Sequence, residues 1–467
     1  MTSIANLLTC TFCLCAFNGM AVYAQDIDCI SCEPQCLCKE EIGQRFNDQQ
    51  KEIIRNNWND FEGENLEKPF PASVPSDVTS IRFDGLGCVY PSFMDDSRLR
   101  ALFLRDWVDY RTLASRSFYM LLRKRPGALA TIRPELAKQF KGLEKIANRN
   151  FSGDPAKVDS LTITNFFKFR QAWNQLFLGE LIQTTRKHIQ DKGIEQLYFF
   201  IPGYNVPYSL AHLQGNRVFE DIDRLVTDSD SKKKILYVRV FWPSNNKKNS
   251  VFGKTRCNIK NQKSLRSGLL NDYVTNRAYL ASLSLRALLR ELDPALSVNV
   301  VSHSFGAVIS TGLVLSPVRK IAKSQRNSPF NQSLLTEFEI GIPRQKITLF
   351  LNAPAIPGRT TFLPLDKNQN ANHHFYIGFN PKDQMLTKQV APVIRWFTSA
   401  AKRNATTLGA DWHGEVNRLK KLVAHQGLEK NFTYCPSLHK NHDYFCYRQQ
   451  EAFKEHFSNY VKSTLSK

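Results

Sequence analysis

The stretch SVNVVSHSFGAVIS, residues 297–310, indicates the fold class of this chain most clearly. Its first part is a largely apolar run that ends at a turn, which is typical of a strand buried on both faces of a sheet. From Phe305 onward the residues are small or apolar, and they predict a helix that begins directly after the turn. A strand that leads through a tight turn into a helix is part of a βαβ unit. The pattern therefore favours an α/β protein.

The same alternation of strands and helices extends from about residue 166 to the C-terminal region. Short apolar strands are expected at residues 195–203, 235–244, 297–304, 346–356 and 373–381. Helices are expected at residues 208–226, 274–293, 305–315, 389–403 and 448–461. Strands that alternate with helices predict βαβ units and a mostly parallel sheet covered by helices on both faces.

The turn itself has the composition of a nucleophile elbow. A turn that exposes a serine between a strand and a helix requires small residues two positions before and after it, and Ser302 and Gly306 flank Ser304 in this way. The pattern is G-x-S-x-G with its first glycine replaced by serine. At this place the N–H of Phe305 and the helix dipole would stabilise negative charge on an attacked carbonyl. A serine that only caps a helix is the alternative interpretation.

A serine hydroxyl needs a base, and the base needs an acid that orients it. In this architecture both follow the serine along the chain. Asp383 is the expected acid because it follows a strand, whereas its rivals are Asp366, which precedes that strand, and Asp411. His442 is the expected base because it lies in a loop before the last helix. The other downstream histidines are His413, His425, His439 and His456.

A second donor to the oxyanion is expected from the stretch FFIPGYNVPY, residues 199–208. Gly203 would let the backbone approach the nucleophile closely, and Tyr204 would present its backbone N–H. An ordinary Pro-Gly turn is the alternative interpretation of the same residues.

The N-terminal part of the chain differs from the rest. Residues 1–24 resemble a cleaved secretory signal, with an almost uncharged run from Leu7 to Val22 and cleavage expected after Ala24. No basic residue precedes this run, so a retained N-terminal membrane anchor stays open as the alternative. Residues 25–165 are expected to form a mainly helical, cysteine-containing extension that serves as a cap or as packing, with one possible strand at residues 78–90. Residues 166–467 are expected to form the α/β domain. We expect a secreted or periplasmic protein.

Cysteine usage agrees with export. Three of the 11 cysteines lie in the predicted signal, and the others are Cys29, Cys32, Cys36, Cys38, Cys88, Cys257, Cys435 and Cys446. An even number in an exported chain predicts disulfides, and one between Cys435 and Cys446 would close a short loop around His442. The cluster at residues 29–38 could instead bind zinc, but it lacks a paired C-x-x-C arrangement. Disulfides are therefore favoured over a metal.

The formal net charge of +21 raises the question of an acidic partner. Such a surface could attract nucleic acid or anionic lipid. The basic residues are spread along the chain without interleaved stacking aromatics, and no nucleic-acid-binding motif occurs. We expect no nucleic-acid partner and at most a weak attraction to anionic surfaces.

Six short motifs together resemble a known family. They are IPGYN (201–205), FWPS (241–244), SHSFG (302–306), NAPAI (352–356), NPKDQML (380–386) and NHDYF (441–445). Their order is similar to that in DUF900, a bacterial family of α/β hydrolases of unknown function. The resemblance covers about residues 197–453. It implies an α/β-hydrolase fold with Ser304, Asp383 and His442 as a catalytic triad, for which no cofactor is required.

Three positions depart from the family pattern. The family histidine before Gly203 is Pro202, the first glycine of the elbow is Ser302, and the aspartate of A-P-D is Ala355. Pro202 bears on the geometry of the oxyanion loop. If the A-P-D carboxylate were the catalytic acid, Ala355 would leave the site incomplete. Asp383 is favoured as the acid because it follows a later strand.

The sequence thus predicts an exported serine hydrolase that cleaves an ester or related acyl bond of a small-molecule or lipid substrate. A catalytically silent binding module that docks an acidic partner or a membrane surface is the alternative, and the departures at Pro202 and Ala355 favour it. A lipase that acts at a membrane, with a lid in the N-terminal region, is a third interpretation.

Overall fold

The structure is a computed structural model that describes the α/β part of the chain. The described ranges are 77–83, 87–89, 160–203, 208–229, 233–242, 269–316, 341–356, 358–383, 408–411, 414–437 and 444–465, with single residues and stretches of two or three residues between them that include Leu386 and His442. The predicted signal, the cysteine cluster at 29–38, Cys257 and the helix expected at 389–403 lie outside the described residues. Within the described part, no helix has the length and apolar character needed to cross a membrane.

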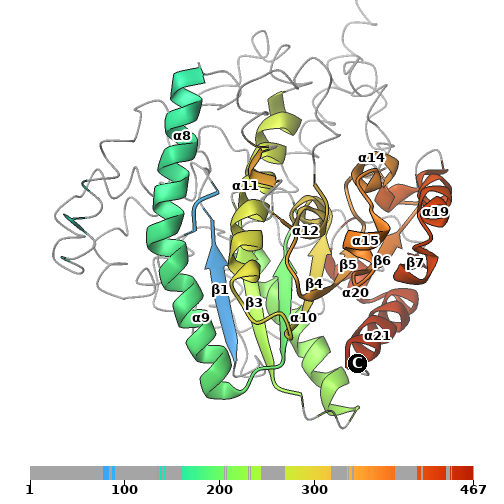
Figure 1. The fold of residues 1–467 in the computed structure, drawn as a ribbon. Coiled ribbons are helices and arrows are strands. Elements are labelled where there is room, and N and C mark those ends of the chain that lie inside the picture. The colour runs from blue at the N-terminus through green and yellow to red at the C-terminus, as the bar shows by residue number, and fades with distance from the viewer. Residues whose placement is uncertain are drawn as a thin grey trace, which may run out of the picture.

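Seven parallel strands form one sheet in the order β1-β3-β2-β4-β5-β6-β7 (Figure 1). They are β1 (Val78–Arg82), β2 (Gln196–Ile201), β3 (Ile235–Phe241), β4 (Ser297–His303), β5 (Lys346–Asn352), β6 (His374–Phe379) and β7 (Phe432–Pro436). The five strands expected in the α/β domain correspond to β2 through β6. The predicted α/β class, with a parallel sheet between helices, is confirmed.

The two edge strands differ from the expectation. β1 falls within the possible strand at residues 78–90 of the predicted N-terminal extension, but it pairs in parallel with β3. The sheet therefore crosses the boundary expected between residues 165 and 166. β7 was not expected from the sequence. Of its five residues only Phe432 and Cys435 are buried, because an edge strand lacks the two-sided burial that produces a continuous apolar run.

Helices bury both faces of the sheet. In β2, Leu197, Phe199 and Ile201 belong to one core, and Tyr198 and Phe200 belong to the other. The first core includes residues of α8 (Ser160–Trp173), the π-helical turn η4 (Asn174–Leu178), α9 (Gly179–Lys192), α11 (Leu269–Arg290), α12 (Gly306–Val314), α14 (Gly358–Phe362) and α19 (Glu415–His425). The second includes residues of α10 (Tyr208–Thr227), α20 (Tyr444–Arg448) and α21 (Glu451–Leu465). Three short helices, α15 (Lys367–Asn370), η7 (Leu408–Ala410) and η9 (Glu429–Asn431), lie in the connections.

The register brings the carboxyl ends of neighbouring strands to one level. His303 of β4 lies opposite Asn352 of β5, Asn352 opposite Gly378 of β6, and Gly378 opposite Cys435 of β7. The loops after β4, β6 and β7 therefore begin at the same edge of the sheet. This is the edge at which α/β proteins bind their ligands.

Candidate active site

Ser304 occupies the tight turn between β4 and α12. Its φ of +52° lies in the left-handed region that residues other than glycine rarely adopt. The N–H of Ser304 donates to the carbonyl of Asn352 at 2.9 Å, and the carbonyl of Ser304 accepts from the N–H of Ala355 at 3.0 Å. Two hydrogen bonds, one to the last residue of β5 and one to the loop that follows it, thus hold the strained residue in place, which is the geometry of a nucleophile elbow.

Gly306 is required because β2 ends directly behind the elbow. A Cβ atom at this position would lie 2.5 Å from the carbonyl oxygen of Ile201 and 2.7 Å from that of Pro202. Both contacts are with backbone, which cannot move away as a flexible side chain can. The other small position, Ser302, is fully buried in β4 opposite Ile201. It accommodates serine in place of the first glycine of the motif.

We expect the substitution Gly306→Ala to destabilise the protein by about 1–3 kcal/mol, because the new methyl group forces the end of β2 outward. Gly179→Ala is the matched control. Gly179 has helical dihedral angles, and a Cβ atom added there would have no neighbouring atom within 4 Å, so alanine should stabilise by about 0.5–1 kcal/mol. Urea unfolding midpoints measure both changes. Equal midpoints for the two variants would contradict the close approach at Gly306.

The structure brings Ser304, Asp383 and His442 together. Nε2 of His442 lies 2.7 Å from Oγ of Ser304, and Nδ1 of His442 lies 2.6 Å from Oδ2 of Asp383. The serine follows β4, the aspartate follows β6 and the histidine follows β7. The ring of His303 packs against that of His442 with their centroids 4.9 Å apart. A hydroxyl, an imidazole and a carboxylate joined in this order can move a proton away from the hydroxyl.

The surroundings of Asp383 favour its charged form. Burial alone would raise the pKa of this carboxyl, but the adjacent His442 and the hydrogen bonds from His442, from the N–H of Leu386 and from the hydroxyl of Tyr447 outweigh it. The net result is a lowered pKa. Asp383 therefore faces the imidazole as a fully buried carboxylate.

The rival residues have other roles or positions. Asp366 caps α15 by accepting hydrogen bonds from two backbone N–H groups, and Asp411 accepts one from the N–H of Val416. His425 is exposed at the end of α19, and His456 lies on α21. His413 and His439 lie outside the described residues.

The expected oxyanion loop passes directly against Ser304. A Cβ atom on Gly203 would lie 3.0 Å from Cβ of Ser304, so glycine permits this approach. Phe305, whose N–H is the expected first donor, precedes α12. Tyr204, which would supply the second donor, lies outside the described residues.

Trp242 links this loop to the residue that follows Ser304, a contact that was not predicted from the sequence. Its Nε1–H donates to the carbonyl of Pro202 at 2.9 Å, and its ring stacks on that of Phe305 with centroids 6.2 Å apart. The loop is thus held through the backbone carbonyl of residue 202, which proline provides as well as histidine does. The tryptophan of the FWPS motif was visible in the sequence, but a motif does not reveal which carbonyl oxygen the indole N–H contacts.

Ala355, which stands where the family pattern has an aspartate, contacts Ser304 through its backbone. Its N–H binds the carbonyl of Ser304, while the carboxylate next to His442 is that of Asp383. The absence of an aspartate at position 355 therefore does not remove the carboxylate from this cluster.

Two more residues near Asp383 could not be assigned to the site from the sequence. The hydroxyl of Tyr447 donates to Oδ2 of Asp383 at 2.7 Å, and Nδ2 of Asn380 donates to the hydroxyl of Tyr447 at 3.3 Å. Asn380 is the first residue of the NPKDQML motif, but nothing in the sequence assigns it a role. Tyr447 gave no signal, since a tyrosine shortly after a histidine is common and only the tertiary fold places it beside the acid.

The expected disulfide around His442 is not formed in this structure. Cys435 is a free thiol at the end of β7, where its side chain is buried. Burial raises the pKa of this thiol to about 12, so it stays protonated and unreactive. The side chain of Cys446 lies outside the described residues. Among the residues that are described, no group of three or more His, Cys, Asp or Glu side chains is arranged to hold a metal ion.

A parallel sheet with a serine elbow after a central strand and a carboxylate–imidazole pair after two later strands defines an α/β hydrolase. The sequence profile of DUF900, described as an alpha/beta hydrolase of unknown function, matches residues 180–426, just over half of the chain. The chain belongs to this family, and the predicted resemblance is confirmed.

Other comparisons add little. No curated protein matches the chain. A crystal structure of an uncharacterized protein from Bacillus cereus is similar at 13% identity, over 78% of this chain and 98% of that one. Its TM-score is 0.29, which is too low to support an argument about fold or function.

Proposed function

We propose that this protein is a serine hydrolase that cleaves an ester or a related acyl bond. One observation carries the proposal: the Ser304 hydroxyl, the His442 imidazole and the Asp383 carboxylate form one hydrogen-bonded chain, with distances of 2.7 and 2.6 Å. The strained backbone of Ser304 also supports it, because strain of this kind occurs where function requires it.

The chemistry follows from the order of these groups. As Oγ of Ser304 forms a bond to the acyl carbon, its proton moves to Nε2 of His442, and Asp383 stabilises the imidazolium through Nδ1–H. His442 then returns the proton to the departing alcohol oxygen, which leaves the acyl group on Ser304. A water molecule repeats both steps and releases the acid. The N–H of Phe305, and in this proposal that of Tyr204, would bind the negatively charged carbonyl oxygen.

The proposal includes export from the cytoplasm. It rests on the signal-like composition of residues 1–24, which lie outside the described residues. The mass of the mature protein tests it, since a chain that still begins at Met1 would contradict cleavage after Ala24.

A fluorophosphonate probe tests the reaction class without knowledge of the substrate. We expect the purified protein to become labelled on Ser304, because the probe reacts only with an activated serine. Ser304→Ala should show no labelling, and heat-denatured wild type should show none either. If folded wild-type protein stays unlabelled, the silent binding module becomes the better interpretation. A series of p-nitrophenyl esters would then measure the acyl-chain preference of a labelled enzyme.

A further inference from the structure

We propose that Tyr447 is a positioning residue that fixes the orientation of the Asp383 carboxylate, so that this carboxylate can orient the imidazole of His442. This inference rests on the proposed serine-hydrolase function and extends it. Tyr447 does not touch the reacting atoms, and it acts through Asp383 alone.

The carboxylate of Asp383 is held at both oxygens. Oδ2 accepts hydrogen bonds from Nδ1 of His442 at 2.6 Å and from the hydroxyl of Tyr447 at 2.7 Å. Oδ1 accepts from the backbone N–H of Leu386 at 3.0 Å. The donors on the two oxygens fix the rotation of the carboxylate, which in turn sets the direction of the imidazole.

The hydrogen bond from Tyr447 has a defined direction. Oδ1 of Asn380 accepts from the backbone N–H of Lys382 at 3.0 Å, so the amide group of Asn380 presents Nδ2 to the tyrosine hydroxyl. Because Nδ2 can only donate, the hydroxyl accepts from Asn380 and uses its own proton for Asp383. Burial, followed by the charge of Asp383, raises the pKa of Tyr447 well above its usual value, so this proton stays in place.

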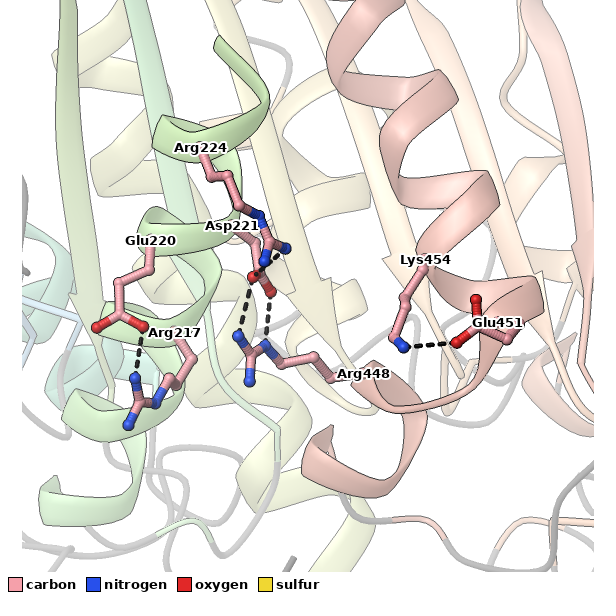
Figure 2. Close-up of polar contacts among 7 residues, drawn as sticks. All are labelled: Arg217, Glu220, Asp221, Arg224, Arg448, Glu451 and Lys454. Atoms are coloured by element: carbon pink, nitrogen blue, oxygen red, sulfur yellow. Dashed lines mark hydrogen bonds and ion pairs between the residues drawn. The ribbon is translucent and has the colours of Figure 1, made fainter. Parts of the chain in front are cut away.

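The helix that carries Tyr447 is anchored to α10 by an ion pair. The guanidinium of Arg448, the next residue of α20, binds Asp221 of α10 through Nε at 2.6 Å and through a second nitrogen at 2.8 Å (Figure 2). Arg224 of α10 binds the same carboxylate at 3.1 Å. The Arg448–Asp221 pair is largely buried, and bidentate pairs of this kind have a well-defined geometry. Tyr447 thus reaches Asp383 from a position set by the scaffold.

Removal of the Tyr447 hydroxyl would take away the hydrogen bond that it donates to Oδ2 of Asp383. The carboxylate could then rotate more freely. We expect Tyr447→Phe to lower the kcat for p-nitrophenyl butyrate, and the rate of fluorophosphonate labelling, about 10- to 100-fold, as for the loss of a hydrogen bond to a charged group. KM should not change, because Tyr447 is almost completely buried and has no surface to offer a substrate. Tyr460→Phe is the matched control, since Tyr460 is also fully buried but packs on α21 among Tyr198 and Phe350. It should keep the wild-type rates.

A double-mutant cycle separates positioning from a general structural effect. If Tyr447 acts through the carboxylate, Tyr447→Phe should slow labelling in wild type but hardly further in Asp383→Asn. An equal loss in both backgrounds would show a structural role and overturn the inference, as would wild-type rates in Tyr447→Phe. An unlabelled wild type would overturn the proposed function and this inference with it. Thermal unfolding of each variant verifies that the rates are compared between folded proteins.

Discussion

His442→Ala is expected to lower the kcat for ester hydrolysis by about 10⁶-fold, the loss that removal of a catalytic histidine causes when it acts as one unit with the serine. His442 is placed to accept the proton of Ser304 at Nε2, 2.7 Å away. Without it the hydroxyl attacks as a neutral, weak nucleophile. The kcat for p-nitrophenyl butyrate and the rate of fluorophosphonate labelling both measure the loss.

The control for this substitution is His425→Ala. His425 is exposed at the end of α19 and lies among the downstream histidines that the sequence left as rivals. Its replacement should leave the rate unchanged. Because His442→Ala removes a general base and leaves space for a small molecule, added imidazole should restore part of the activity. A rate within tenfold of wild type in His442→Ala would exclude it as the base.

The second large effect is expected for Asp383→Asn, which should lower kcat by about 10⁴-fold. Asparagine keeps the size of the side chain, but it can offer Nδ2–H to the imidazole and so stabilise the wrong tautomer of His442. Asp366→Asn is the matched control, since asparagine also caps helices well and α15 should persist. Similar losses in both variants would argue against a special role of Asp383.

The same variant tests the charge of Asp383 through its effect on stability. Because the native pKa of this carboxyl is lowered, its contribution to stability is complete above the unfolded-state value of about 3.9 and is lost as the pH falls through the native pKa. Wild type should therefore lose stability relative to Asp383→Asn as the pH falls below about 4. Unfolding midpoints at pH 7 and pH 3 measure the difference. A constant difference would contradict a lowered pKa.

The central part of the fold and three residues of the candidate site could be predicted from the sequence. Strands β2 through β6 are buried on both faces and therefore appear as apolar runs, and helices between them require a parallel sheet. A parallel sheet has one carboxyl edge, so Ser304, Asp383 and His442 could be expected to meet there. The edge strands β1 and β7 gave weaker patterns because neighbouring elements cover them less completely.

Contacts between residues that are far apart in the sequence could be known only from the tertiary structure. The hydrogen bond from Tyr447 to Asp383, that from Trp242 to Pro202 and the pairing of β1 with β3 depend on how loops and helices pack after the strands have formed. Burial periodicity reveals whether a side chain faces a core, but it carries no information on the partner that a hydroxyl or an indole finds there. The sequence alone was enough to predict the central strands, their carboxyl edge and the types of chemical group at that edge. Packing across the sheet determined which groups hold them in place.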